Sequence, residues 1–270
     1  MKPAVSNIAW PAADDEAALD MLLEANVRHI EIAPTRYWPN LTQVDEPEAR
    51  SFAEKLHQRG FRICAFQALL FGKPELQVFG PDDGRACLEY LEGVCQLAGW
   101  MGAKALVFGS PKNRLRGGLS FEAALAKATD FFRVLGDTAI KNGVIVCIEP
   151  NPSAYGCDFI QTANEAASLV ELVNSPGIRM NLDMGELMMN GASAGRAIEE
   201  LLPYAGHFHV SEPMLEPFDS SREAHAQAAS ALKKARYRGI VSLEMKTPSG
   251  GLPVVKEALQ NMLQAYFPHP

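Results

Sequence analysis

The chain has 270 residues, of which 47% are hydrophobic and 21% charged, so it can bury a large core. A formal net charge of −7 argues against a nucleic-acid partner, whose phosphates must be neutralised, and favours a small substrate. No apolar stretch reaches the ~20 residues that span a bilayer, and the N-terminus lacks a signal-peptide layout, so we expect no membrane partner. The five cysteines lack CxxC spacing, as expected of reduced thiols in a cytoplasmic protein.

Short apolar or β-branched runs alternate along the chain with longer segments of helical period. We predict strands at 4–10, 28–33, 61–66, 104–109, 144–149, 178–183, 206–210 and 240–245. Between them, apolar residues recur at helical spacing, as at Leu88 and Leu91. The sequence TANE has the form of a capping box, in which Thr162 and Glu165 satisfy each other's free amides at the start of a helix.

This order of elements predicts one domain over residues 1–270. Eight units of strand then helix, with no linker between them, are typical of a (β/α)8 TIM barrel. The strands are continuous apolar runs, which is typical of parallel sheets covered on both faces. A doubly wound open sheet is the alternative, but the chain has neither GxGxxG nor a P-loop.

Candidate ligands stand at the ends of four consecutive predicted strands. In a parallel barrel the loops that follow the strands converge on one rim, where functional side chains collect. The candidates on that rim are Glu149, Asp183, His209 and Glu244. Each alone could cap a turn or pair in the core, but the four together are explained most economically by one divalent metal ion. Three carboxylates and one imidazole suit Mn²⁺, Mg²⁺, Co²⁺ or Zn²⁺.

The motifs around these residues carry a family resemblance. IEPNP, NLDMGE, HFHVSEP and VSLEM, between residues 144 and 246, resemble the xylose-isomerase-like TIM-barrel superfamily. That superfamily, of the AP endonuclease family 2 type, includes sugar phosphate isomerases and epimerases, inosose dehydratases and relatives of endonuclease IV. The resemblance implies one divalent ion held by the four candidate ligands. It also implies that Glu149 and Glu244 form an acid/base pair on opposite faces of a substrate carbon.

Such a site suits proton transfer next to a carbonyl. Deprotonation there creates an enediolate, whose charge a metal ion stabilises, while two carboxylates remove and return the proton. We therefore predict a metal-dependent isomerase or epimerase of a small, sugar-like hydroxy-carbonyl compound. A metal-dependent dehydratase, like inosose dehydratase, is the alternative, and an inactive carbohydrate-binding relative or an endonuclease is less favoured. Whether the chain forms a homo-oligomer stays open.

The residues around the ligands depart from the sugar-epimerase pattern. The resemblance implies a glutamate six residues after the first ligand, a histidine three after the aspartate and an arginine six after the histidine. This chain has Tyr155, Glu186 and Leu215 at those places.

Candidate substrate contacts come from the same rim. They are Trp10, Gln67, Tyr155, Glu186, Ser211, Glu212 and Lys246. Trp10 could instead close the barrel mouth, Glu186 could face solvent, and a lysine such as Lys246 is usually solvated. The loop TPSGG at 247–251 precedes a helix and is a candidate phosphate site, although its glycines also suit a plain turn.

The remaining histidines are expected outside the ligand set. His207 is predicted to lie deeper in the barrel as a structural residue. Surface or packing positions are expected for His29, His57, His225 and His269.

Overall fold

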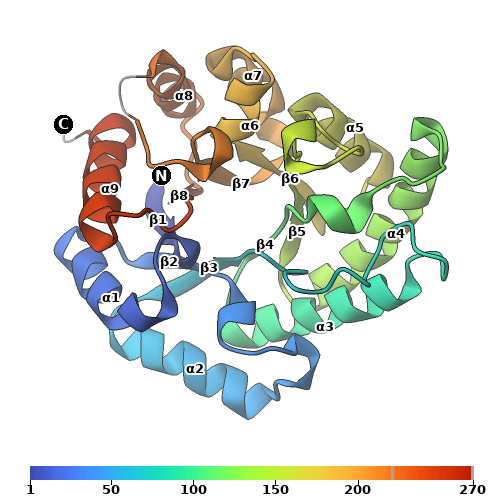
Figure 1. The fold of residues 1–270 in the computed structure, drawn as a ribbon, viewed down its shortest axis with the longest axis horizontal. Helices are drawn as coiled ribbons and strands as arrows, with labels where there is room; N and C mark the ends of the chain where they lie inside the picture. Colours follow the sequence, from blue (N-terminus) through green and yellow to red (C-terminus); the bar gives the residue numbers. More distant parts are fainter. Residues whose placement is uncertain (220–221, 269–270) are drawn as a thin grey trace.

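The computed structural model of the protein describes residues 1–219 and 222–268. Its eight strands pair in parallel and in chain order, and β1 also pairs with β8, so the sheet closes into a barrel (Figure 1). The strands are β1 (Lys2–Ser6), β2 (His29–Ile32), β3 (Arg62–Phe66), β4 (Ala105–Phe108), β5 (Ile145–Ile148), β6 (Ile178–Asp183), β7 (Ala205–Val210) and β8 (Ile240–Leu243). The predicted (β/α)8 barrel is confirmed, and the open doubly wound sheet is excluded.

Helices surround the barrel (Figure 1). They are α1 (Asp15–Glu24), α2 (Glu46–Gln58), α3 (Arg85–Met101), α4 (Phe121–Lys141), α5 (Ala163–Val173), α6 (Met184–Met189), α7 (Ala194–Leu201), α8 (Glu223–Lys234) and α9 (Leu252–Tyr266). The predicted capping box is present at the start of α5, where Thr162 and Glu165 each bond the other's backbone amide. Within the described part of the chain, no helix has the length and apolar composition needed to cross a bilayer.

The first strand is where predicted and observed boundaries differ most. We predicted it at 4–10, whereas β1 ends at Ser6 and a 3-10 turn spans Asn7–Ala9. The Ser6 hydroxyl accepts a hydrogen bond from the amide of Ile8, and this side-chain cap starts the turn early. The other strands agree with their predicted runs to within one or two residues.

Apolar side chains fill two separate spaces. Most of them form one large cluster between the helices and the outer face of the barrel. A second, small cluster brings together side chains from four strands: Ala4, Cys64, Ala65, Ala105 and Cys147. Since alternate strand residues share a face, Cys147 faces the same side as Glu149, which follows two residues later toward the carboxyl end of the barrel. Small residues therefore fill the barrel on the N-terminal side of the candidate site.

Candidate metal centre

The four predicted ligands come together at the carboxyl end of the barrel. Glu149 and Glu244 directly follow β5 and β8, Asp183 ends β6, and His209 lies near the end of β7. One ligand atom from each residue lies within 4.8 Å of the others. All four side chains are buried, so they form one compact donor group rather than four surface charges.

His209 lies in the middle of this group. Its Nδ1 is 3.2 Å from Glu149 Oε1, 3.1 Å from Glu244 Oε2 and 3.9 Å from Asp183 Oδ2. Despite these short distances, Nδ1 has no hydrogen-bond partner of acceptable geometry. A buried nitrogen without a partner costs free energy, whereas a cation between the four groups would satisfy it. The donor set therefore fits a divalent ion.

The pKa values of the carboxylates also indicate a cation site. Burial, with repulsion from the neighbouring carboxylates, raises the pKa of Glu244 to about 7. Burial and the charge of Glu149 likewise raise the pKa of Asp183 to about 7. Burial also opposes ionisation of Glu149, but nearby His209 and the amide of Asn181 bring its pKa below the usual value. Three charged carboxylates at this spacing need an added positive charge to stay ionised together.

Glu149 is held by amide groups on both of its oxygens. Asn181 Nδ2 donates to Oε1 at 2.7 Å, and Asn151 Nδ2 donates to Oε2 at 3.3 Å. Gly109, just after β4, makes room for this carboxylate, since a Cβ there would lie 2.1 Å from Glu149 Oε2. The absence of a side chain at Gly109 is therefore a requirement of the observed Glu149 position.

A buried arginine binds the backbone of Glu149 and the neighbouring Asn151. Arg114 donates to the backbone oxygen of Glu149 at 2.7 Å and to Asn151 Oδ1 at 2.8 Å. It also donates to the backbone oxygen of Phe108 at 3.2 Å and stacks over the Phe108 ring. Arg114 thus ties the ends of β4 and β5 together and orients the amide that contacts Glu149.

Asp183 is fixed by the start of α6 and by β7. Its Oδ1 accepts the backbone amide of Glu186 at 2.6 Å, as a helix N-cap. The hydroxyl of Ser211 donates to Oδ2 and accepts the amide of Gly185. We predicted Ser211 as a substrate contact, whereas its hydroxyl is engaged in positioning Asp183.

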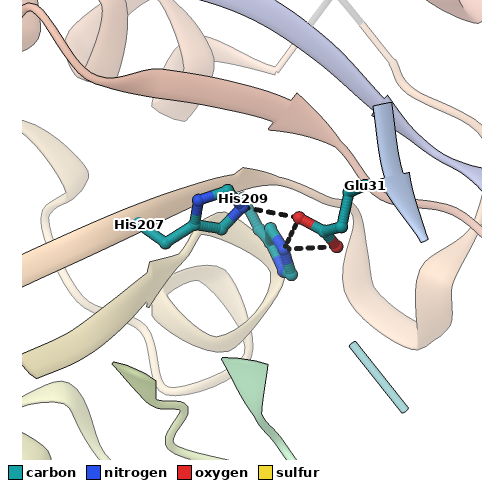
Figure 2. Close-up of side chains that lie close together, drawn as sticks. All are labelled: Glu31, His207 and His209. Carbon is teal, nitrogen blue, oxygen red and sulfur yellow. Dashed lines mark hydrogen bonds and ion pairs between the residues drawn. The ribbon is translucent and has the colours of Figure 1, made fainter. Parts of the chain in front are cut away.

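The other ring nitrogen of His209 faces a residue from the opposite end of the chain. Glu31, in the middle of β2, lies 3.0 Å from His209 Nε2 and also contacts His207 (Figure 2). All three side chains are buried. The register between β2 and β3 shifts at Ile30/Glu31, and that between β6 and β7 shifts at Met180/Asn181, so the barrel is irregular where its polar residues meet.

A cavity of about 620 Å³ opens beside the candidate ligands. Glu149, Asp183 and Glu244 line one part of it, and three of the predicted substrate contacts also line it: Gln67, Tyr155 and Glu186. The loops after β3 and β4 supply an apolar wall, made of Ala68, Leu70, Phe71, Pro74 and Pro111. The same loops also bring Lys73 and Lys112 to the lining. Leu215 joins the apolar wall, at the position where the resemblance implies an arginine.

Three other predicted substrate contacts lie away from the cavity lining. Trp10 is buried and donates its indole N–H to Asp15 at 2.8 Å, because the early turn after β1 moves it out of the strand. Glu212 is buried, with its carboxylate turned to His225 at 3.0 Å. Lys246 is exposed and pairs with Glu216.

The phosphate and histidine predictions have different outcomes. Residues 247–251 line no part of this cavity in the described chain, so a phosphate site there would be separate from it. His57 is exposed, and His225 packs between Glu212 and Tyr266, as expected of surface and packing residues. His269 lies outside the described residues.

Several residues at the site were not predicted from the sequence. Glu31 stands in an apolar strand run, where a buried charge signals a partner, but its partners are 176 and 178 residues away. Asn181 precedes Asp183 by two residues and so shares its face of β6, a signal that was available. Arg114 ends a short 3-10 helix, Pro111–Arg114, and no spacing pattern in the sequence marks it.

Comparisons with known proteins add to this geometry. The family model described as "Xylose isomerase-like TIM barrel" matches residues 19–266. A D-psicose 3-epimerase from Agrobacterium fabrum is 26% identical over 126 residues, which are 47% of this chain and 43% of that enzyme. The matched stretch therefore spans less than half of that relative.

Solved structures with the same fold cover nearly the whole chain. A D-psicose 3-epimerase crystallised in the presence of D-fructose has a TM-score of 0.81 at 16% identity, covering 100% of both chains. The IolI protein with a bound zinc atom has a TM-score of 0.72 at 17% identity, covering 98% of this chain and 96% of that one. At these identities the likeness establishes the fold.

Proposed function

Because the chain belongs to the xylose isomerase-like TIM-barrel family, we propose that it is a divalent-metal-dependent isomerase or epimerase. Its substrate is a small, sugar-like hydroxy-carbonyl compound. The observation that carries the proposal is His209 Nδ1, which is buried without a hydrogen bond and faces three carboxylates beside a cavity. A D-psicose 3-epimerase among the relatives supports sugar chemistry of this kind.

A group of oxygen and imidazole ligands would hold the ion: Glu149, Asp183, His209 and Glu244. Mn²⁺, Mg²⁺, Co²⁺ and Zn²⁺ all suit such a set. When bound, a divalent ion supplies Lewis-acid polarisation of the substrate carbonyl. The protein's own contribution is to keep three carboxylates buried at one place, with amides and hydroxyls that fix their orientation.

We assign the acid/base pair to two of these carboxylates. Glu149 and Glu244 follow β5 and β8, which are three strands apart around the closed barrel, so they reach the cavity from different sides. Asn181 and Asn151 donate hydrogen bonds to Glu149, which favours its ionised form and the role of base. Among the described hydrogen bonds, the Glu244 carboxylate receives none from an amide, which suits a group that carries a proton as acid.

The cavity lining favours one orientation of the substrate. Hydroxyl and carbonyl groups of the substrate would lie by the carboxylates, within reach of Gln67 and Glu186. The far end would meet the apolar wall, represented by Leu70, Phe71 and Leu215. We propose that this end carries fewer hydroxyl groups than an open-chain hexose, because an apolar wall leaves such groups without hydrogen bonds.

One observation keeps a lyase as the second candidate. Glu186 lines the same cavity and is buried, and its Oε2 has no hydrogen-bond partner. Its Oε1 is held by the Asn190 amide at 2.7 Å and by the Ala163 backbone amide at 3.1 Å. A fixed carboxyl with a free oxygen is suited to protonate a departing hydroxyl, which is the step that separates dehydration from isomerisation.

Hydrogen exchange with solvent tests the proposal. We expect purified protein with added Mn²⁺ or Co²⁺ to replace one substrate C–H by deuterium in D₂O, across a panel of ketoses, keto-inositols and hydroxy acids. Product analysis by NMR then separates an epimer or isomer from a dehydrated product. Exchange on no member of the panel by the metal-loaded protein contradicts the isomerase proposal.

Metal removal supplies the second measurement. A ligand that binds only the native state stabilises it by about 2.7 kcal/mol at one hundred times its dissociation constant. We therefore expect a chelator to lower the melting temperature and added Mn²⁺, Co²⁺ or Zn²⁺ to restore it. A melting temperature indifferent to all of these ions contradicts a metal site.

A further inference from the structure

Glu31 is a fully buried carboxylate that none of the steps above uses. It lies in β2, and its exposed fraction is 0%. Its two oxygens face the rings of two histidines from β7 (Figure 2). The distances are 2.6 Å from Oε2 to His207 Nε2, and 3.0 Å and 3.1 Å from the two oxygens to His209 Nε2. A buried charge persists only where such partners compensate it.

The two rings approach the carboxylate in different orientations. His207 and His209 are two residues apart on β7, and their ring planes are inclined by 83° with centroids 5.1 Å apart. This T-shaped arrangement brings both Nε2 atoms to one carboxylate, as Figure 2 shows.

The protonation of the rings follows from this contact. An ionised carboxylate only accepts hydrogen bonds, so each histidine must present an N–H at Nε2. For His209 this assigns the proton to Nε2 and leaves the lone pair on Nδ1, the atom that faces Glu149, Asp183 and Glu244. The carboxylates on that side would favour the opposite tautomer, with the proton on Nδ1, in which the ring cannot bind a metal through that atom.

Glu31, His207 and His209 could also be considered as a metal site of their own, since their ligand atoms lie close together. However, the contact of 2.6 Å between Glu31 and His207 has the length of a charge-assisted hydrogen bond, and Glu31 is hydrogen-bonded to both rings. Nδ1 of His209, on the other side of the ring, is buried without a hydrogen-bond partner and faces three further carboxylates. The geometry therefore places the cation on the Nδ1 side.

We propose that Glu31 is a positioning residue that locks His209 in the tautomer with Nε2 protonated and so directs the Nδ1 lone pair to the divalent ion. His207 is the second donor that holds the Glu31 carboxylate in place. Histidines that bind metals commonly donate their other N–H to a carboxylate, and loss of such a partner weakens metal binding by about 10- to 100-fold. The inference rests on the metal site of the proposed function but not on its reaction.

The substitution Glu31→Gln tests this role. Glutamine keeps the shape of the side chain but lacks its charge. Both oxygens of Glu31 contact His209 Nε2, so in either orientation the glutamine NH₂ group would face the Nε2–H of His209 and oppose that tautomer. We expect Zn²⁺ affinity, measured by competition with a chromogenic chelator, to fall about 10- to 100-fold. No substrate is needed for this measurement.

A matched control is present elsewhere in the chain. Glu212 and His225 form a second buried pair, 3.0 Å apart, on the outer side of the barrel near α8 and α9. Glu212 also pairs with Arg222 at 2.7 Å, but none of its described contacts is with the four candidate ligands. Glu212→Gln likewise removes a buried carboxylate charge that pairs with a histidine, so we expect Zn²⁺ affinity within about twofold of the original protein. Equal losses in both variants, or no loss in Glu31→Gln, would overturn the proposal.

The unmodified protein provides a test that does not depend on a variant folding. In Zn²⁺-loaded protein labelled with ¹⁵N-histidine, long-range ¹H–¹⁵N spectra report which ring nitrogen carries the proton. We expect His209 to carry it on Nε2 and to bind Zn²⁺ through Nδ1; the reverse assignment overturns the proposal. Failure of the unmodified protein to bind Zn²⁺, Mn²⁺ or Co²⁺ would remove the proposed metal site itself. If the protein binds metal with this tautomer but exchanges no substrate hydrogen, the proposed role of Glu31 stands and the isomerase proposal fails.

Discussion

On the side of β5 to β8 the cavity is lined by buried carboxylates, whereas the loops after β3 and β4 contribute most of its apolar residues, together with Lys73 and Lys112. Asp183 and Glu244 are 8% and 7% exposed, but Phe71 is 76% exposed. The first side belongs to strand ends and the second to irregular segments. Under the proposed function, paired strands would fix the groups that react, while loops, which pair with no neighbouring strand, would select the molecule that enters.

The largest effects are expected on the carboxylate side, from Glu149→Gln and Glu244→Gln. Glutamine keeps the shape of the side chain but cannot take up a proton, so turnover should fall by about 10²-fold or more even at saturating metal. We expect Glu149→Gln to abolish hydrogen exchange, because the base is lost. Glu244→Gln should still exchange hydrogen without forming product.

The comparison of exchange with product formation separates these roles. Turnover and deuterium incorporation are measured on the same fully metallated samples, with metal content checked by elemental analysis. A variant that keeps more than about a tenth of the original turnover shows that its carboxylate is not the acid or base.

Gly109 lines the cavity between its carboxylate side and its apolar side. We expect Gly109→Ala to have an intermediate effect on turnover. The new Cβ would lie 2.1 Å from Glu149 Oε2, so the carboxylate must move. Misplacement by about 1 Å can cost up to about 10²-fold, so we expect kcat/KM to fall about 10- to 100-fold. Gly118→Ala is the control, because a Cβ there meets nothing within 4 Å and should leave kcat/KM unchanged. Similar behaviour of the two variants would contradict the close approach at Gly109.

The smallest effect is expected on the apolar side, from Phe71→Ala. Because Phe71 is largely exposed, its replacement should leave thermal stability within about 0.5 kcal/mol of the original. KM should rise about fivefold with kcat little changed, since a substrate that buries less apolar surface binds more weakly by on the order of 1 kcal/mol. Leu172→Ala, at an exposed site on α5, serves as the control in the same assay. A change in kcat would place Phe71 in the reaction rather than in substrate selection.

The sequence predicted the carboxylate side of the cavity because strand ends have a defined location in a closed barrel. Glu149, Asp183 and Glu244 each end or directly follow a strand, so their convergence follows from the fold. Spacing does not reveal which way a side chain turns after the strand ends. Glu212, for this reason, was expected in the cavity but turns toward His225 on the outside.

Interactions between distant segments could not be predicted in the same way. The charge of Glu31 inside an apolar run indicated a buried partner, but nothing in β2 identifies β7 as its source. Arg114, at the end of a four-residue 3-10 helix, binds four backbone or side-chain oxygens near Glu149. A segment this short shows no periodic pattern in the sequence. The apolar wall likewise comes from loops, whose path depends on packing between elements rather than on local pattern.

The pairing of Glu31 with His207 also bears on the order in which the chain can fold. Its two residues are 176 positions apart, so β2 leaves the ribosome long before the partner of its carboxylate exists. Burying Glu31 alone would cost several kcal/mol, which opposes premature closure of an N-terminal half-barrel. The partners of Glu31 are therefore present only after β7 has been made, and a chain that ends before β7 would leave this carboxylate without them.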